Sequence, residues 1–235
     1  MRVHSFESLA AVDGDGLRYA VFLCGCPLRC VYCHNPDTWQ AQGTDYTTEE
    51  LLKKIKRYKP YMTAGGGGVT FSGGEPLLQA SSINEIAPYL SDEGINYALD
   101  TSGVVPLTDE VKKAIDNADL VICDLKFPDK DSFKRYAKGD FNAVLSTLDY
   151  LNKTGKRTWI RTVVVPNIND SKESIEKYVN IIKGMKNIER YQLLGFHTMG
   201  FFKYDNLEYE NTLKDTPPMD NDKLAELQSY AESLL

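Results

Sequence analysis

The chain has no long hydrophobic run. Nowhere in its 235 residues is there an apolar stretch of the roughly 20 residues that a membrane-spanning helix needs, and the start Met1-Arg2-Val3-His4-Ser5 lacks the apolar core of a signal peptide. From these absences we expect neither a membrane-spanning helix nor a secretion signal. We therefore expect a cytoplasmic location and no membrane partner.

Positive charge is also in short supply. The chain has 27 Lys and Arg against 33 Asp and Glu, which gives a net charge of -6. Nucleic-acid binding depends on clustered Lys and Arg, so we expect no nucleic-acid partner. With 42% hydrophobic residues the chain is long enough to form one good core, and a single domain over residues 1–235 is the simplest organisation.

Cysteine is scarce, and its odd count of five argues against a disulfide framework. Cys26, Cys30 and Cys33 lie within eight residues of one another, whereas Cys24 comes at the end of the preceding predicted strand and Cys123 lies in a distant apolar strand. A 4Fe-4S cluster normally takes four thiolates, so a loop that offers three leaves one iron with an open coordination position. The spacing predicts a cluster that can also bind a ligand, in a reducing compartment.

The rest of the chain repeats a β-branched or aromatic run, a turn and a helical stretch. The runs predict strands over residues 19–23, 69–71, 95–99, 120–124, 159–165 and 191–194. A capping box at Thr47 and Glu50 and apolar stripes over residues 83–90 and 144–151 predict helices between them, and a last helix is expected over residues 221–234. This alternation indicates an α/β fold with parallel strands joined by right-handed crossovers.

Glycines flank the second predicted strand. Gly65-Gly66-Gly67-Gly68 precedes it and Gly73-Gly74-Glu75-Pro76 follows it, without the Gly-Lys-Ser/Thr that a P-loop requires. We interpret the four-glycine run as a flexible connection. We interpret Gly73 and Gly74 as positions where the main chain approaches a ligand closely, because glycine has no Cβ.

The cysteine run is flanked by Val12-Asp13-Gly14-Asp15-Gly16-Leu17-Arg18 upstream and His34-Asn35-Pro36-Asp37-Thr38-Trp39 downstream. Together these motifs resemble the radical S-adenosylmethionine (radical SAM) superfamily and, within it, the glycyl-radical activating enzymes. The chain is most similar to the activases of pyruvate formate-lyase, from His4 to about Lys203. The resemblance implies an open, partial (β/α)6 barrel with its core over about residues 15–200, a C-terminal helix over about 220–235 packed on it, and a site at the carboxyl ends of the strands.

The resemblance also implies an activity. In this family a reduced 4Fe-4S cluster cleaves S-adenosylmethionine, and the 5′-deoxyadenosyl radical abstracts a Cα hydrogen from a glycine loop of the partner, here pyruvate formate-lyase. No side chain need act as acid or base, because the cofactors carry the chemistry. Flavodoxin or ferredoxin would supply the electron under anaerobic conditions, and the protein would be a monomer.

Residue by residue, the resemblance assigns a site. The cluster ligands would be Cys26, Cys30 and Cys33. The S-adenosylmethionine site would comprise Tyr32, Cys33, His34, Gly73, Gly74, Glu75, Asp124, Leu125, Lys126, Arg161 and His197. A monovalent cation beside the cofactor carboxylate would take oxygen ligands from Asp100, Thr101, Asp124 and the backbone carbonyl of Ile122. Asp13 would lie near the partner peptide.

Other interpretations remain open from the residues alone. Within the superfamily, the substrate could be another glycyl-radical enzyme or a small molecule. A zinc-binding structural module could use Cys26, Cys30, Cys33 and His34 as four ligands. An iron–sulfur electron carrier would need a fourth thiolate from Cys24 or Cys123.

Overall fold

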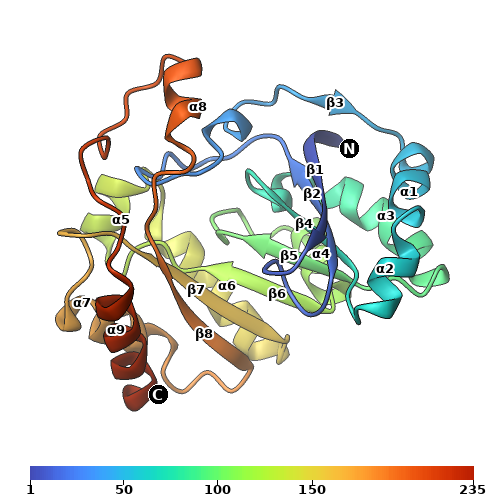
Figure 1. The fold of residues 1–235 in the computed structure, drawn as a ribbon. Helices are drawn as coiled ribbons and strands as arrows, with labels where there is room; N and C mark the ends of the chain where they lie inside the picture. The colour runs from blue at the N-terminus through green and yellow to red at the C-terminus, as the bar shows by residue number, and fades with distance from the viewer.

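The computed structural model, which describes residues 1–235, is built on one curved sheet of eight strands in the order β3-β1-β2-β4-β5-β6-β7-β8 (Figure 1). Six neighbouring strands are parallel, as predicted. They are β2 (Arg18–Leu23), β4 (Val69–Gly73), β5 (Tyr97–Thr101), β6 (Leu120–Asp124), β7 (Thr158–Val164) and β8 (Ile188–Gly195). The two ends of the sheet do not pair with each other, so the predicted open barrel is confirmed.

The sequence analysis did not predict two of the strands. β1 (Arg2–Ala10) pairs antiparallel with β2, and β3 (Thr44–Asp45) pairs antiparallel with β1. The register of β1 shifts between Val3 and Ser5 and again between Ser8 and Ala10. Such irregularities break the two-residue alternation of buried and exposed side chains, which is the signal that sequence reading depends on.

Most of the helices cover one face of the sheet (Figure 1). The helices are α1 (Thr48–Lys56), α2 (Lys59–Ala64), α3 (Ala80–Asp92), α4 (Asp109–Asn117), α5 (Lys130–Tyr136), α6 (Phe141–Thr154), α7 (Lys172–Ile182), α8 (Phe201–Asn206) and α9 (Asn221–Leu234), with 3-10 turns η1 (Pro36–Thr38) and η2 (Pro76–Gln79). The predicted capping box starts α1: Thr47 accepts from the Glu50 backbone N–H, and the Glu50 carboxylate accepts from the Thr47 backbone N–H. None of these helices is both long and apolar enough to cross a membrane.

The two faces of the sheet bury different side chains. Val121 and Cys123 of β6 belong to the large core cluster of 50 buried residues, whereas Leu120 and Ile122 belong to a cluster of four with Ala98 and Trp159. Side chains alternate between the faces of a strand, so the small cluster lies on the inner, concave face. It fills the barrel interior around the amino-terminal half of β6 and leaves the carboxyl ends of the strands free for a site.

Helix α9 packs on the sheet and covers its last strand, β8. Gln228 accepts a hydrogen bond from the backbone N–H of Leu193 at 2.8 Å and donates one to the carbonyl of Tyr191 at 3.0 Å. Both partners belong to β8, the last strand. One glutamine thereby pairs two backbone groups that an edge strand would otherwise leave open.

The four-glycine run is a packing surface, and the prediction of a flexible connection is wrong. A Cβ on Gly67 would lie 1.9 Å from the carbonyl oxygen of Leu17, and a Cβ on Gly16 would lie 2.2 Å from that of Gly65. The loop between β1 and β2 is thus pressed backbone to backbone against the residues that precede β4. The buried guanidinium of Arg18 joins them further, through hydrogen bonds to the Val69 carbonyl and the Thr70 hydroxyl. Glycine is required here for contact rather than for mobility.

Candidate active site

A cavity of about 400 Å³ opens at the carboxyl ends of the parallel strands. Most of the residues that the sequence assigned to a site line it, although they come from seven separate segments of the chain. Those lining the cavity are Asp13, Cys26, Cys30, Tyr32, Cys33, His34, Gly73, Gly74, Asp100, Thr101, Asp124, Lys126, Arg161 and His197. Three assigned residues, Glu75, Ile122 and Leu125, do not line it.

The cysteine loop follows β2 and is held by its main chain. Arg29 and Val31 donate backbone hydrogen bonds of 2.8 and 2.9 Å to Ala137 and Tyr136, the residues that end α5. Cys33 closes the loop with a 3.0 Å backbone bond to Cys30. The loop therefore has a fixed shape before any ligand binds, and its three thiols face one cavity.

The thiols are protonated in the protein alone. Burial raises the pKa of Cys26 to about 12, and burial also raises the pKa of Cys30 and of Cys33. A bound metal centre deprotonates its thiol ligands outright, so these three side chains suit a group that brings its own positive charge. The donor set, three cysteines around one cavity, fits a 4Fe-4S cluster held at three corners.

The alternatives from other protein classes are not supported by this geometry. No group of three or more His, Cys, Asp or Glu side chains is arranged to hold a single metal ion, as a zinc module would require. Cys24 donates to the Gln42 carbonyl at 2.9 Å, and Cys123 is fully buried in the core. Neither lines the cavity, so no fourth thiolate is available to make an electron carrier.

Gly73 and Gly74 also pack against another stretch of main chain, where a side chain would not fit. A Cβ on Gly73 would lie 2.4 Å from the Leu23 nitrogen, and a Cβ on Gly74 would lie 2.1 Å from the Gly25 carbonyl oxygen. Their backbone thus packs against the segment that leads from β2 into the cysteine loop, and Gly74 donates a 2.9 Å hydrogen bond to Leu23. The absent side chains bring the exit of β4 and the start of the cysteine loop together beneath the cavity.

Glu75 supports the site from beneath. It is fully buried and accepts four hydrogen bonds, from the Thr101 hydroxyl at 2.6 Å, the backbone and hydroxyl of Ser102 at 2.9 and 2.6 Å, and the Leu77 backbone at 3.1 Å. Burial nevertheless outweighs these bonds and leaves the pKa of Glu75 above its ordinary value. The carboxyl ties the turn after β4 to the end of β5, so it positions the cavity wall without facing the cavity.

Four half-buried charged side chains form a network on the cavity wall. Arg161 donates to Asp100 at 2.5 Å and to Asp124 at 3.1 Å, Lys126 donates to Asp124 at 2.6 Å, and Ser72 donates to Asp100 at 2.8 Å. Burial works to raise the pKa of Asp124, but the adjacent Lys126 and Arg161 outweigh it, so the pKa lies below its usual value. The cavity wall therefore presents two acidic and two basic side chains side by side to a ligand.

The residues assigned to a cation are engaged with other partners. Thr101 donates its hydroxyl hydrogen to Glu75, and both aspartates pair with Arg161. The Ile122 side chain lies in the small cluster on the inner face of the sheet. Leu125, assigned to the cofactor, points the other way into the large core.

Two histidines stack on the cavity wall. The rings of His34 and His197 lie 3.8 Å apart between centroids at 22°, and His34 Nε2 is 3.3 Å from the His197 carbonyl oxygen. Burial, followed by the neighbouring imidazole, lowers the pKa of His34 to about 4. His197 Nδ1 is buried without a hydrogen-bond partner in the protein, so a polar ligand in the cavity would satisfy it.

The tyrosine of the cysteine loop is fixed from behind. Tyr32 donates its hydroxyl to the Lys126 carbonyl at 3.3 Å, and Tyr178 of α7 donates to the same oxygen at 3.1 Å. The Tyr32 side chain is only 4% exposed. It connects the cysteine loop to the segment that carries the Lys126 ammonium.

Asp13 reaches the cavity from the loop between β1 and β2. Its carbonyl accepts a 2.7 Å hydrogen bond from Thr70, which fixes the loop below the site. Burial, and after it the charge of Asp100, raises the pKa of the Asp13 carboxyl to about 6, although Arg161 opposes the shift. The Asp13 carboxyl is the acidic group on this side of the cavity.

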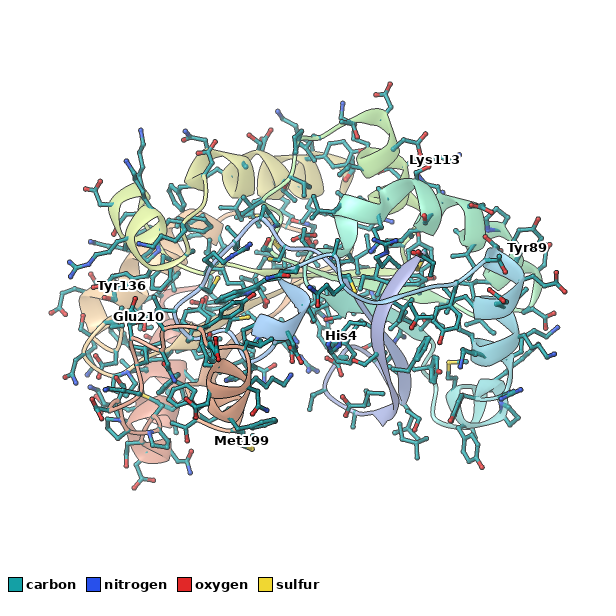
Figure 2. The ribbon with its side chains drawn as sticks, turned by 90° about the horizontal axis from the view of Figure 1, so that it is seen from above. His4, Tyr89, Lys113, Tyr136, Met199 and Glu210 are labelled. Atoms are coloured by element: carbon teal, nitrogen blue, oxygen red, sulfur yellow. The ribbon has the colours of Figure 1, made fainter.

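The sequence analysis did not predict that the segment around α8 holds the cysteine loop in place. Tyr204 of α8 donates its hydroxyl to the Cys33 carbonyl at 2.9 Å, and Lys203 donates to Asn35 at 2.9 Å and pairs with Asp37 at 3.0 Å. Asp37 also lies 3.3 Å from His4 Nε2. Figure 2 shows His4 near the middle of the molecule and Met199, which begins this segment, at its margin. The contacts of Lys203 and Tyr204 join residues more than 160 positions apart, so no local sequence pattern predicts them.

Comparison with known proteins identifies the superfamily that the cysteine motif resembles. The family model of the radical SAM superfamily matches residues 21–179. The pyruvate formate-lyase-activating enzyme of Clostridium pasteurianum is 44% identical over 235 residues, which cover 100% of this chain and 98% of that protein. The enzyme of the same name from Staphylococcus epidermidis is 37% identical, over 97% of this chain and 94% of that protein.

Solved structures agree on the fold. A domain of pyruvate-formate lyase-activating enzyme from Bacteroides vulgatus superposes with a TM-score of 0.59 at 19% identity, covering 72% of this chain and 94% of that one. A radical SAM methyltransferase from Sphaerobacter thermophilus gives 0.68 at 16% identity, covering 95% of this chain and 68% of that one. At these identities the likeness concerns the fold alone.

Proposed function

This chain belongs to the radical SAM superfamily and, within it, to the pyruvate formate-lyase-activating enzymes, and we propose that it installs a glycyl radical in pyruvate formate-lyase. The observation that carries this proposal is that three thiols, with no fourth, line one cavity together with a network of two acidic and two basic side chains. When bound, a 4Fe-4S cluster and S-adenosylmethionine supply reductive cleavage of a carbon–sulfur bond and thereby the capacity to abstract a glycine Cα hydrogen.

The residues of the cavity would hold these groups as follows. Cys26, Cys30 and Cys33 would hold the cluster, because they are the thiols that face the cavity. Lys126 and Arg161 would orient the cofactor carboxylate, since both are charged donors on the wall.

The neutral groups would position the rest of the cofactor. The backbone at Gly73, Gly74 and Glu75 would receive its amino group. Tyr32, His34 and His197 would line the adenine and methionine portions, and the unpartnered His197 Nδ1 supports a polar contact there.

The partner glycine would enter past Asp13. The Asp13 carboxyl lines the cavity from the loop between β1 and β2 and could meet the backbone of an extended peptide. An opened loop of the partner has to be stabilised by the interface that receives it. None of these steps needs a side chain as acid or base.

Further features of the activity follow from the same resemblance. A monovalent cation would bind Asp100, Thr101, Asp124 and the Ile122 carbonyl. A flavodoxin or a ferredoxin would deliver the electron, and the protein would act as a cytoplasmic monomer with residues 1–235 forming one radical SAM domain.

The direct test is electron paramagnetic resonance. The protein, loaded with iron and sulfide without oxygen and then reduced, is mixed with S-adenosylmethionine and pyruvate formate-lyase. We expect an organic radical on the lyase and release of deoxyadenosine. If deoxyadenosine appears without a radical on the lyase, the superfamily chemistry stands and the substrate assignment falls.

Cysteine variants provide the matched controls. Alanine at Cys26, Cys30 or Cys33 should abolish both iron binding and radical formation, because two thiolates cannot hold the cubane in place. Alanine at Cys24 or Cys123 should leave iron content near that of the unaltered protein, since neither side chain lines the cavity. An iron-free Cys123→Ala variant that still folds would contradict the ligand assignment.

A further inference from the structure

The cysteine loop rests on the end of helix α5. Arg29 and Val31 donate their backbone N–H groups to the carbonyls of Ala137 and Tyr136, at 2.8 and 2.9 Å. Val31 follows Cys30 directly, so a single hydrogen bond joins the end of the helix to a proposed cluster ligand. No residue of α5 lines the cavity, and the helix therefore meets the loop outside it.

Helix α5 and the residues just beyond it carry unpaired positive charge. Lys130 and Lys134 are four positions apart and hence neighbours on one side of the helix, and Lys138 follows shortly after the helix ends. With Arg135 they make four exposed basic side chains, which we call the α5 basic surface. None of the four forms an ion pair with a carboxylate of this chain. Their charge is free to meet a partner.

The carboxylates that are close in sequence do not cancel this charge. Asp129 caps α5 and pairs with Lys177 at 3.4 Å, and Asp140 caps α6. Asp131 is the one exposed carboxylate within α5 itself. The α5 basic surface therefore keeps an excess of positive charge, although the whole chain has a net charge of -6.

A second basic run, on α1, differs in both respects. Lys56 and Lys59 pair with Glu93 at 2.5 and 3.1 Å, and Lys54 lies over two aromatic rings. Helix α1 also lies on the opposite side of the molecule from α5 (Figure 1). Of the two runs, only the α5 basic surface adjoins the cysteine loop.

Aromatic rings lie between this surface and the loop. The ring of Tyr136 on α5 lies 5.2 Å from that of Phe127, and Phe127 lies 5.7 Å from Tyr32 of the cysteine loop, between centroids. Phe127 and Tyr32 are buried, whereas Tyr136 is half-buried. Electron tunnelling falls off steeply with distance and is faster through bonds and packed side chains than through open space. These rings and the Val31 hydrogen bond connect the α5 basic surface to the cysteine loop.

We propose that the α5 basic surface is the docking site of an acidic protein that donates one electron to the cluster. In this step the donor loses one electron and the cluster gains it, while no bond is made or broken and no proton is transferred. Complementary charge speeds such an encounter and orients the two proteins. The inference rests on the proposed function for the presence of a cluster. A donor bound here leaves the cavity open to the lyase, because α5 does not line it.

The test compares the rates of cluster reduction by protein donors and by a small reductant. The anaerobic holoenzyme is mixed at low ionic strength with reduced flavodoxin and, in parallel, with reduced ferredoxin; photoreduced deazaflavin is the small neutral reductant. In Lys134→Gln/Lys138→Gln the second-order rate constant with a protein donor should fall about threefold to tenfold, while reduction by deazaflavin stays unchanged. The difference should vanish in ~1 M salt, where the Debye length is about 3 Å.

Lys53→Gln/Arg57→Gln is the matched control. These two side chains are also exposed, basic, four positions apart and without ion pairs, but they lie on α1 and at its C-cap. The control changes the net charge by the same amount and should leave the rate unchanged. Binding of oxidised flavodoxin or ferredoxin to the cluster-free protein gives a second readout. Its Kd should rise about threefold to tenfold in the α5 variant and not in the control.

Each outcome decides the question. No fall in Lys134→Gln/Lys138→Gln with either protein donor overturns the proposal, and so does an equal fall in the control, which would reflect net charge alone. Slower glycyl-radical formation with deazaflavin as reductant would mean that the lyase binds α5, and would overturn it too. Absence of any cubane in the unaltered protein would refute the proposed function, whereas binding to the cluster-free protein still tests the surface.

Discussion

Replacement of Asp13 by Asn should stabilise the protein without its cofactors above pH 6. The Asp13 carboxyl accepts no hydrogen bond in the structure, and burial and the charge of Asp100 raise its pKa to about 6. The folded protein therefore holds this proton at pH values where the unfolded chain has released it. Asparagine has the same shape and no charge, so the substitution removes the cost of holding an ionised carboxylate at this position and changes little else.

The magnitude and its sign follow from the shift. A pKa of about 6 against an ordinary value of 3.8 is a difference of about two units, or ~3 kcal/mol at 1.36 kcal/mol per unit. The side chain retains some contact with water, so we expect about 1–3 kcal/mol. Because the folded pKa is the higher one, the carboxylate destabilises the fold fully above pH 6, and this effect fades as the pH falls towards 4.

Urea unfolding of the protein without cluster, at several pH values from 8 to 5, measures this directly. The difference in unfolding free energy between Asp13→Asn and the unaltered protein should be largest at pH 8 and shrink as the pH falls below 6. Asp215→Asn, which neutralises an exposed loop carboxylate, should show no such trend. A variant no more stable than the original at pH 8, or a gain that does not depend on pH, would refute the reasoning.

Three further substitutions test other parts of the structure by urea unfolding. Gly67→Ala should destabilise the fold by about 2–3 kcal/mol, because its Cβ would lie 1.9 Å from the Leu17 carbonyl oxygen, and an unchanged stability would mean that the loop is free to move. Arg161→Gln should destabilise by ~3 kcal/mol and raise the pKa of Asp124, since it removes one of the two cations beside that buried carboxylate; a loss under 1 kcal/mol would contradict the buried network. Thr47→Ala should lose about 1 kcal/mol with the cap of α1, and no loss would show that the capping box is dispensable.

The sequence predicted the parts of the fold that depend on local pattern. All six parallel strands and the last helix lie close to where hydrophobic periodicity placed them, although β5 is shifted by two residues and β8 begins three residues earlier than expected. The rule that function gathers at the carboxyl ends of parallel strands then brought residues from distant motifs to one cavity. The cysteine spacing and the resemblance supplied the rest of that prediction.

What the sequence did not predict depends on contacts between distant segments. A run of glycines has the same composition whether it is flexible or packed against another main chain, so the role of Gly67 needed coordinates. The two-residue alternation of β6 continues through Leu125 and turns its side chain to the core, although its neighbours Asp124 and Lys126 face the cavity. Trp39 was visible as part of a motif, but the rings that pack on its indole come from Tyr204 of α8 and from Tyr209.

The charge network links two sites that the sequence analysis predicted separately, the S-adenosylmethionine site and the cation site. Asp100 and Asp124 are paired with Arg161 in this structure, and Asp124 also with Lys126, so their charges are already balanced and a bound cation would add an excess positive charge. A cofactor carboxylate changes that balance, because it competes for the same two cationic side chains and brings a negative charge of its own. The aspartates then have charge to offer to a cation, together with the oxygen ligands that a hard ion prefers. Cation affinity should therefore depend on the cofactor, and binding of either one should strengthen binding of the other.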